Sequence, residues 1–508
     1  MQTFKNPVLA GFSPDPSVCA VGDDYYLVTS TFSYFPGVPI YHSKDLVNWT
    51  QIGNVLDREE QLNLTGLNHS EGIFAPTLRY HDGTFYMITT NVPHGGNFVV
   101  TATDPAGPWS NPYFIDNAPG IDPSLYFDDD GKCYYVGTRE DRLGAKYNGD
   151  WEVWLQEFDL ETMQLTGVST AIWKGALKDA IWPEGPHIYK KDGYYYVMIA
   201  EGGTSFNHAV TIARSKSIDG PYVGNKNNPI LTHRHLGSQF PVHNVGHADL
   251  VETPDGKWYM TCLAVRPIDG YSNMGRETFL AEVIWEDDWP VVNPGAGRLL
   301  EEQEHALPLQ PVKERETFDL TEDNPSFLHL RNPDVNRYDS ESREGWLRVF
   351  PNEYTLKDKA SPIYRGLRQS AASFTLSTRL EEHLTDKSEA GLALIQSNEY
   401  AVRLVLVTSG GDKQVQFIST SNGEDRVIGL KSVDSSEMEL TIEVTGLNLK
   451  ASFKADNEEV VVVEDADIHH LSPEVAGGFV GCTMGIYATS LKDDGHADFN
   501  YLKLINHS

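Results

Sequence analysis

Three acidic residues between positions 13 and 186 have similar flanking sequences, which contain proline together with glycine or serine. Asp15, Asp122 and Glu184 occur in Ser13-Pro-Asp-Pro-Ser17, Gly120-Ile-Asp-Pro-Ser124 and Trp182-Pro-Glu-Gly-Pro186. Such flanks predict rigid, irregular strand ends that aim a side chain. A carboxylic acid and a carboxylate on opposite faces of a sugar can cleave a glycosidic bond. A third carboxylate adds a like charge, which holds a proton on its neighbour. Together the three could act as base, acid and modulator of glycoside hydrolysis.

A five-fold repeat places these acids at one position of a recurring unit. Each unit has a turn followed by an aromatic-rich strand, and the units close on Tyr26, Tyr86, Tyr134, Tyr196 and Tyr259. The residues 12 positions before the closing tyrosine, or 11 in the first unit, are Asp15, Phe74, Asp122, Glu184 and His247. A single Asp-Pro-Ser more often caps a turn. Turn caps need not share a register, however, so we expect these five side chains to converge at the mouth of one channel.

The repeat also predicts the fold of the first 300 residues. Each unit contains about four short strands, marked by alternating apolar residues and by turn residues. Four of the five units carry Asp-Gly at the turn, which favours a tight hairpin. Four-stranded sheets repeated around an axis form a β-propeller, so residues 1–300 are predicted to be an all-β, five-bladed β-propeller. The first strand of each blade is the innermost, which is why its side chains can meet.

The last third of the chain is predicted to be a second all-β domain. Residues 301–316 are polar and contain prolines, which is typical of a linker. Residues 317–508 show regularly spaced strands, which indicate a β-sandwich. No catalytic cluster occurs there, so we expect the sandwich to pack on the propeller and close one end of its pocket. A closed pocket would make the enzyme exo-acting. A free-standing carbohydrate-binding module is the alternative.

Composition restricts the partners. A net charge of −32 repels nucleic acids and anionic membranes and is compatible with a neutral, small oligosaccharide substrate. Four scattered cysteines without a Cys-x-x-Cys pair predict buried free thiols instead of a zinc site or a disulfide framework. The first residues lack the apolar stretch of a signal peptide, and no apolar run is long enough to span a membrane. We therefore expect a cytoplasmic protein.

The chain resembles glycoside hydrolase family 43 throughout the repeat region and beyond it. Beyond the repeat, Gly477-Gly-Phe-Val-Gly-Cys-Thr-Met-Gly-Ile-Tyr487 resembles the jelly-roll-like sandwich appended to a branch of the family, so residues 317–508 are expected to be such a domain. The resemblance lies in Asn6-Pro-Val-Leu9, Gly11-Phe-Ser-Pro-Asp-Pro-Ser17, Ser30-Thr-Phe-Ser-Tyr-Phe-Pro-Gly37, His42-Ser-Lys-Asp-Leu-Val-Asn-Trp49, Glu184-Gly-Pro-His187, Ala200-Glu-Gly-Gly-Thr204, Gly246-His-Ala-Asp-Leu250 and Gly275-Arg-Glu-Thr278. It implies an inverting mechanism in which Asp15 is the general base that activates water. Glu184 would be the general acid, and Asp122 would raise the pKa of Glu184 and orient it.

The resemblance also implies roles for a histidine and an arginine. His247 matches a channel histidine that lies beside a bound calcium ion or its water shell in many relatives; a purely structural hydrogen-bonding role stays open. Arg276 matches an arginine that binds the terminal sugar, where a planar fork suits two hydroxyls. The alternative for Arg276 is a surface salt bridge with Glu277 or Glu282.

Further residues are expected to shape the sugar site by the same resemblance. Phe32 and Phe74 would form walls of the subsite for the terminal sugar, with plain core packing as the alternative. Thr204 and Phe206, on the loop after the acid's strand, are additional binding candidates. Relatives of this family often assemble, so a homo-oligomer is also expected.

The sugar preference depends on a departure from the family pattern. The β-xylosidases of the family usually have Trp-Ala-Pro-Asp where this chain has Phe74-Ala-Pro-Thr77. That version resembles the branch with α-L-arabinofuranosidase activity, so release of terminal arabinofuranosyl residues is expected. A β-D-xylosidase or a bifunctional enzyme remains open. Two rivals are a non-catalytic carbohydrate-binding propeller and a retaining fructofuranosidase, although the latter usually opens with an Asn-Asp-Pro-Asn phrase that is missing here.

Overall fold

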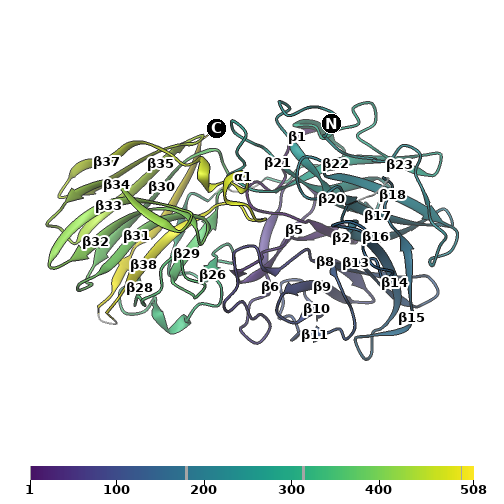
Figure 1. Cartoon of the computed structure of the whole chain (residues 1–508), viewed down its shortest axis with the longest axis horizontal. Helices are drawn as coiled ribbons and strands as arrows, with labels where there is room; N and C mark the ends of the chain where they lie inside the picture. Colours follow the sequence, from purple (N-terminus) through teal and green to yellow (C-terminus); the bar gives the residue numbers. More distant parts are fainter. Residues whose placement is uncertain (1, 178–180, 312–314, 493–494, 508) are drawn as a thin grey trace.

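The structure is a computed structural model that describes residues 2–177, 181–311, 315–492 and 495–507. Strands are the main regular secondary structure of the described chain and helix is almost absent, which confirms the predicted all-β class. The described helices are α1 (Pro473–Ala476) and the 3-10 turns η1 (Val335–Arg337) and η2 (His469–Leu471). None of the described helices has the length and apolarity needed to cross a membrane. Two bodies of strands lie side by side, the C-terminal one at the left of Figure 1 and the N-terminal one at the right.

Five antiparallel sheets make up the N-terminal body, in chain order. The first contains β2 (Ser17–Val21), β3 (Asp24–Val28), β5 (Gly37–Ser43) and β6 (Thr50–Leu56). The second contains β7 (Gly72–Ile73), β8 (Thr77–His81), β9 (Thr84–Val92), β10 (Gly96–Ala102) and β11 (Tyr113–Phe114). The third contains β12 (Ile121–Phe127), β13 (Cys133–Glu140), β14 (Trp151–Asp159) and β15 (Gln164–Trp173). The fourth contains β16 (Glu184–Lys191), β17 (Tyr194–Glu201), β18 (Ala209–Ser215) and β19 (Val223–Gly224). The fifth contains β20 (His243–Glu252), β21 (Trp258–Val265), β22 (Glu277–Glu286) and β23 (Trp289–Val292).

The inner strands of these sheets form a closed ring. β2 contacts β8, β8 contacts β12, β12 contacts β16, β16 contacts β20, and β20 contacts β2. The chain start helps to close it, because β1 (Gln2–Lys5) pairs with β24 (Glu302–His305) and the side chain of Asn6 donates to the Leu280 carbonyl at 2.9 Å. The Asp-Gly turns behave as predicted at Asp82 and Asp192, where both residues of the turn have positive φ. One edge of every sheet therefore faces a common axis.

Two larger sheets form the C-terminal body. Nine strands make the first: β25 (Thr317–Asp319), β27 (Tyr338–Asp339), β28 (Leu347–Val349), β30 (Ser373–Glu382), β35 (Glu437–Thr445), β36 (Asn448–Ala455), β37 (Glu458–Asp467), β39 (Ala497–Phe499) and β40 (Tyr501–His507). Six strands make the second: β29 (Ile363–Arg368), β31 (Ser388–Ser397), β32 (Tyr400–Ser409), β33 (Asp412–Ser421), β34 (Glu424–Ser432) and β38 (Thr483–Ser490). Leu376 and Leu440 of the first sheet share one apolar core with Leu392 and Leu404 of the second.

The outer face of the six-stranded sheet packs against the N-terminal body. Phe12 and Tyr34 of the N-terminal body share a buried cluster with Ile395 and Tyr487 of the sheet. The Tyr34 hydroxyl also lies 3.1 Å from the Thr483 hydroxyl, and β4 (Tyr34–Phe35) pairs with β26 (His329–Leu330). The two bodies are therefore joined by both apolar packing and backbone pairing. These contacts determine which residues of the C-terminal body lie next to the ring of inner strands.

Candidate active site

A cavity of about 280 Å³ lies at the end of the ring and contains all three carboxylates. Its lining consists of Asp15, Phe32, Phe74, Ala75, Ile121, Asp122, Trp182, Glu184, Gly203, Thr204, His208, His247, Arg276 and Phe479. All five residues that the repeat aligned are among them. The repeat thus predicted the convergence. Asp15 and Phe74 lie between strands, however, and Asp122 and His247 lie at irregularities within β12 and β20.

A larger groove, of about 1120 Å³, lies on the outside of the fourth and fifth sheets and contains none of these acids. Its aromatic rings are already covered: the Arg214 guanidinium lies 4.4 Å from the ring centres of both Tyr194 and Trp289. We place the chemistry in the smaller cavity, because that is where groups with perturbed pKa values converge.

The backbone around the cavity is held in unusual conformations that direct the side chains inward. Asp15, Asp122 and His247 have φ values of 54°, 53° and 46°, in the left-handed region that costs non-glycine residues free energy. The strand pairing also shifts at Asp122, after Glu184 and around His247. Such bulges re-aim side chains at functional sites. Gly185 is needed here, since a Cβ atom on it would lie 2.7 Å from the His247 ring.

Asp15 is held as a carboxylate. The Ser30 hydroxyl donates to its Oδ2, and Nη1 of Arg276 donates to its Oδ1 at 2.8 Å. Nδ1 of His247 lies 3.8 Å from the same Oδ1. Burial alone would raise the pKa of Asp15, but the charge of Arg276, together with His247 and the Ser30 hydrogen bond, outweighs burial and lowers this pKa below its ordinary value.

Glu184 and Asp122 are shifted in the opposite direction. Burial and the negative charges of Asp122 and Asp15 raise the pKa of Glu184 well above its ordinary value. Burial raises the pKa of Asp122 to about 6, with Asp15 adding to the rise and His247 opposing it. The cavity therefore contains an ionised acid, Asp15, and an acid that keeps its proton near neutral pH, Glu184. Acid–base catalysis requires one group of each kind.

Arg276 is buried beside Asp15 and is not a surface residue. Its Nη1 is within 3.4 Å of the Thr204 hydroxyl, and its Nη2 donates to the Phe479 carbonyl at 3.2 Å. The predicted alternative, an ion pair with Glu277, is not what the structure shows, because Glu277 is bound by Arg266 at 2.7 Å. Arg276 thus links Asp15 to the wall of the cavity.

Three phenylalanines form the apolar wall. The ring centres of Phe32 and Phe74 are 5.3 Å apart, and Phe479 lies 5.9 Å from Phe32 and 6.1 Å from Phe74. Phe479 belongs to the C-terminal body and was not predicted. It occurs in a glycine-rich stretch after α1, and nothing in the repeat could assign it to this cavity.

The two weaker predictions on the loop after β17 have different outcomes. Thr204 lines the cavity and contacts Arg276. Phe206 does not line the cavity; its ring packs edge-on against His243 with 5.6 Å between ring centres. In the structure Phe206 thus packs on His243 beside the cavity, and its role in sugar binding stays a prediction.

His208 is a cavity residue that sequence reasoning missed. Its Nδ1 lies 2.9 Å from the Asn244 carbonyl, which can only accept, so Nδ1 carries the proton. Burial lowers the pKa of His208 to about 4, so the ring is neutral and Nε2 is an acceptor. Gly246 permits this position, because a Cβ atom there would be 2.4 Å from the ring. No repeat or motif marked His208; its location on the loop before β18 is the only signal.

The donor set around His247 does not fit a calcium ion held by protein ligands. Calcium takes six to eight oxygen ligands. Asp15 is the carboxylate within ion-pair distance of His247, and its oxygens are already engaged by Ser30 and Arg276. Among the described residues, the one set of three His, Asp or Glu ligands close enough for a metal is in the C-terminal body. We derive no step through a metal here.

Two family models and several known proteins match this chain. The model of the family "Glycosyl hydrolases family 43" matches residues 4–290, and that of "Beta xylosidase C-terminal Concanavalin A-like domain" matches residues 315–504. A xylosidase/arabinosidase of Butyrivibrio fibrisolvens is 50% identical over 512 residues, covering 99% of each chain. A non-reducing end alpha-L-arabinofuranosidase of Bacteroides ovatus is 38% identical, covering 98% of this chain and 93% of that protein. The solved structure of a xylan beta-1,4-xylosidase from Bacillus halodurans superposes with a TM-score of 0.91 at 35% identity, covering 99% of both chains.

Proposed function

The chain belongs to glycosyl hydrolase family 43, and from that premise we propose that it is an exo-acting, inverting enzyme that releases terminal α-L-arabinofuranosyl residues from arabinoxylan- or arabinan-derived oligosaccharides. The observation that carries the proposal is the opposite shift of two pKa values, Asp15 downward and Glu184 upward, inside one cavity. We also propose that the five sheets are the blades of a five-bladed β-propeller and that the two later sheets form a jelly-roll-like β-sandwich.

The proposed reaction is a single displacement. Asp15 takes a proton from a water molecule while the oxygen of that water forms a bond to the anomeric carbon. The glycosidic bond breaks, and Glu184 gives its proton to the departing oxygen, which leaves as an alcohol. Asp122 contributes its charge, which keeps the proton on Glu184 until that moment. At the end of the cycle Asp15 holds a proton and Glu184 has lost one, and exchange with solvent restores both.

Exo-action is supported by the small volume of the cavity and by the contribution of the C-terminal body to its wall. Phe479 of the C-terminal body forms part of its wall, and the Phe479 carbonyl is fixed by Arg276. A volume of about 280 Å³ is at the lower end of ligand cavities and suits one sugar ring with its aglycone pointing outward. The enzyme would therefore remove one sugar at a time from a chain end.

The sugar preference rests on Phe74. Phe74 lines the cavity, whereas Thr77 is buried in β8 and is not part of the lining, so the departure that bears on the pocket is the one at Phe74. The smaller ring of Phe74, compared with the tryptophan of the family's β-xylosidases, leaves a differently shaped wall. β-Xylosidase activity is the second candidate, because a xylosidase/arabinosidase and a xylan beta-1,4-xylosidase both match over nearly the full chain.

We expect hydrolysis of 4-nitrophenyl α-L-arabinofuranoside to exceed that of the β-D-xylopyranoside in kcat/KM. A change in one apolar wall of a pocket alters the ratio of kcat/KM values for two substrates by roughly tenfold. Phe74→Trp should therefore lower the ratio of arabinoside to xyloside kcat/KM by about that factor. Steady-state kinetics on both substrates measure the ratio. A wild-type preference for the xyloside would leave the mechanism in place and exclude the arabinose assignment. Folded protein inactive on both would favour a non-catalytic role or another sugar.

His208 is expected to bind a sugar hydroxyl through Nε2. His208→Phe removes that acceptor and should raise KM by about tenfold, the scale of one buried hydrogen bond, with a smaller effect on kcat. His208→Gln, which keeps an acceptor, should recover part of the loss. Thermal unfolding of both variants separates this from a packing defect. Equal KM values for wild type and a stable His208→Phe variant would contradict the assignment.

A further inference from the structure

The lining of the active-site cavity divides into a buried end and a partly exposed rim. The buried residues, which are between 2% and 7% exposed, include Asp15, Asp122, His208 and His247. The lining residues that reach solvent more are Phe74, Ile121, Trp182, Glu184, Thr204 and Phe479. A terminal sugar held at the buried end must extend its leaving part past this rim, and Glu184, the proposed acid, is on it. Rim residues beside Glu184 are therefore placed to contact the leaving part of the substrate.

Trp182 is the aromatic rim residue nearest in sequence to Glu184, two positions before it. Its φ of 47° lies in the left-handed region, which costs a bulky residue free energy. Neighbouring loops hold it there: the Trp182 N–H donates to the Gly149 carbonyl at 2.8 Å, and the Ile181 carbonyl accepts from the Gly202 N–H at 2.9 Å. Backbone strain of this kind is concentrated at functional sites, so the Trp182 side chain is a candidate for a function beyond packing.

Two glycines support the indole of Trp182 from behind. A Cβ atom on Gly149 would lie 3.1 Å from Cε2 and Nε1 of the indole, and a Cβ atom on Gly203 would lie 3.1 Å from its Cε3. The main chain can approach the indole this closely because both residues lack a side chain. Phe32 and Phe74 pack on each other, whereas no aromatic ring among the described residues packs on Trp182. The indole therefore rests on main chain and turns its remaining surface to the cavity that it lines.

The loop between β13 and β14, which carries Gly149, is fixed by its own aspartates. Oδ1 of Asp141 accepts from the Leu143 N–H at 2.9 Å, and Oδ2 of Asp150 accepts from the Lys146 N–H at 2.9 Å. The Asp141 N–H also donates to the Asp150 carbonyl at 3.0 Å, which closes the base of the loop. A ligand that binds at the indole does not have to order this loop, and the entropic cost of binding is lower for that reason.

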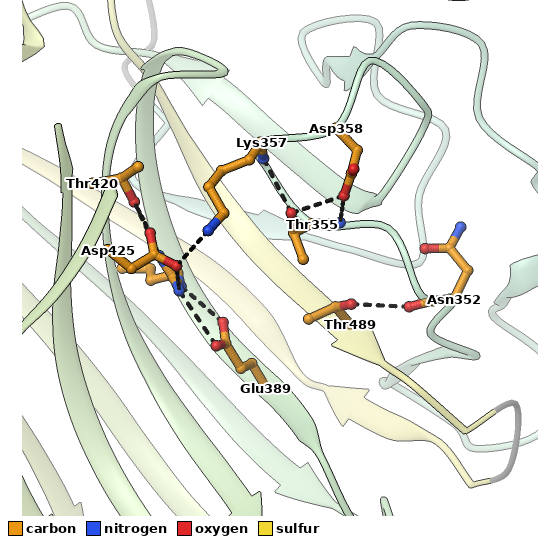
Figure 2. A network of polar contacts seen from close by, with 9 residues as sticks. Asn352, Thr355, Lys357, Asp358, Glu389, Thr420, Asp425 and Thr489 are labelled. Carbon is orange, nitrogen blue, oxygen red and sulfur yellow. Dashed lines mark hydrogen bonds and ion pairs between the residues drawn. The ribbon is translucent and has the colours of Figure 1, made fainter. Parts of the chain in front are cut away.

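The charged network of the C-terminal body differs from the rim, because its charged groups are engaged by one another. Figure 2 shows Asp425 with the Thr420 hydroxyl at 2.7 Å and Nζ of Lys357 at 3.0 Å. The buried Arg403 donates to Asp425 at 3.0 Å and to Glu389 at 2.8 Å. These contacts connect β31, β32, β33 and β34, so we assign this network to holding the six-stranded sheet together and not to binding a ligand.

We propose that Trp182 is the platform on which the first sugar of the leaving part stacks during hydrolysis. An indole presents a large, rigid apolar face, and a neutral pyranose ring can cover it with its C–H groups. This inference rests on the proposed function, in which Glu184 protonates the oxygen between the terminal sugar and that next sugar. Trp182 would take no part in the chemistry itself. It would supply binding energy far from the reacting bond, which favours oligosaccharides over simple glycosides in kcat/KM.

Two substrates with the same terminal sugar test the platform: arabinofuranosyl-substituted xylotriose and methyl α-L-arabinofuranoside. Trp182→Ala should lower kcat/KM on the oligosaccharide by roughly tenfold, the scale of one stacked ring, and affect the methyl glycoside much less. Trp182→Phe should recover part of the loss. Tyr113→Ala is the matched control, because Tyr113 is 44% exposed on β11 at the outer edge of the second sheet, and it should change neither value. Equal losses on both substrates, or no loss in folded Trp182→Ala, would overturn the proposal.

Fluorescence titration with xylotriose gives a second measurement that needs no turnover. Xylotriose stacked on Trp182 should change the tryptophan emission of the wild type and of Asp15→Asn, and the change should be lost in Trp182→Phe, although the other tryptophans remain. Inactivity of the wild type on pentosides would contradict the proposed function, whereas this titration would still report on Trp182. The same emission change in Trp182→Phe as in the wild type, or no change in the wild type, would overturn the platform.

Discussion

Asp15→Asn is expected to lower kcat on an aryl α-L-arabinofuranoside by roughly 10²–10⁴-fold, the contribution typical of a positioned general base. Asparagine keeps the size of the side chain; its Oδ1 can accept from Arg276 and its Nδ2 can donate to the Ser30 hydroxyl, so the cavity should retain its shape. It cannot take a proton from water. Because the substrate is still bound, KM should change much less than kcat.

The control for this variant is another buried aspartate outside the cavity. Asp128 accepts from Nζ of Lys190 at 2.8 Å and from the Tyr195 hydroxyl at 2.7 Å, and it does not line the cavity. Asp128→Asn should leave kcat near the wild-type value. Near-normal turnover by a folded Asp15→Asn variant would exclude Asp15 as the base.

Glu184→Gln is expected to have an effect that depends on the leaving group. A nitrophenolate leaves with little help, whereas the alcohol of an oligosaccharide must receive a proton. The loss in kcat should therefore be largest, again roughly 10²–10⁴-fold, on oligosaccharides and smaller on nitrophenyl substrates. A plot of rate against leaving-group pKa should be steeper for the variant than for the wild type. Equal losses on all substrates would contradict an acid role for Glu184.

The pH profile provides the matching signature of the same residue. Glu184 acts in its protonated form, and its raised pKa places the alkaline limb of kcat/KM above the ordinary range of a carboxyl group. The lowered pKa of Asp15 places the acid limb below that range. Asp122→Asn removes a negative charge beside Glu184, so the alkaline limb should move to lower pH. The alkaline limb should disappear in Glu184→Gln.

Sequence periodicity could predict which residues converge, because a repeated unit brings equivalent positions to one axis. It could not predict how they are aimed. Asp15 lies before β2, which begins at Ser17, while Asp122 lies inside β12 and Glu184 begins β16. The left-handed φ values and bulges at these positions arise from contacts such as that between Gly185 and the His247 ring, which no single-strand pattern encodes.

The remaining parts of the site come from elements outside the repeat. Phe479 reaches the cavity because the six-stranded sheet packs on Phe12 and Tyr34, a contact between bodies that are far apart in sequence. Trp182 and His208 lie on loops whose course is set by tertiary packing. The C-terminal domain has no catalytic residues, so a role in walling the pocket could be expected for it. The sequence could not predict that Phe479 is the residue that forms this wall.

The stereochemistry of the first-formed product tests the central claim most directly, namely that Asp15 directs water onto the anomeric carbon while Glu184 protonates the leaving group. Proton NMR of the wild-type enzyme acting on the preferred nitrophenyl pentoside would follow the anomeric signals before mutarotation. Attack by water in one step predicts that the sugar first appears with the opposite anomeric configuration to the substrate. First appearance of the sugar with retained configuration would show a covalent intermediate and contradict the assignment of Asp15 as a general base.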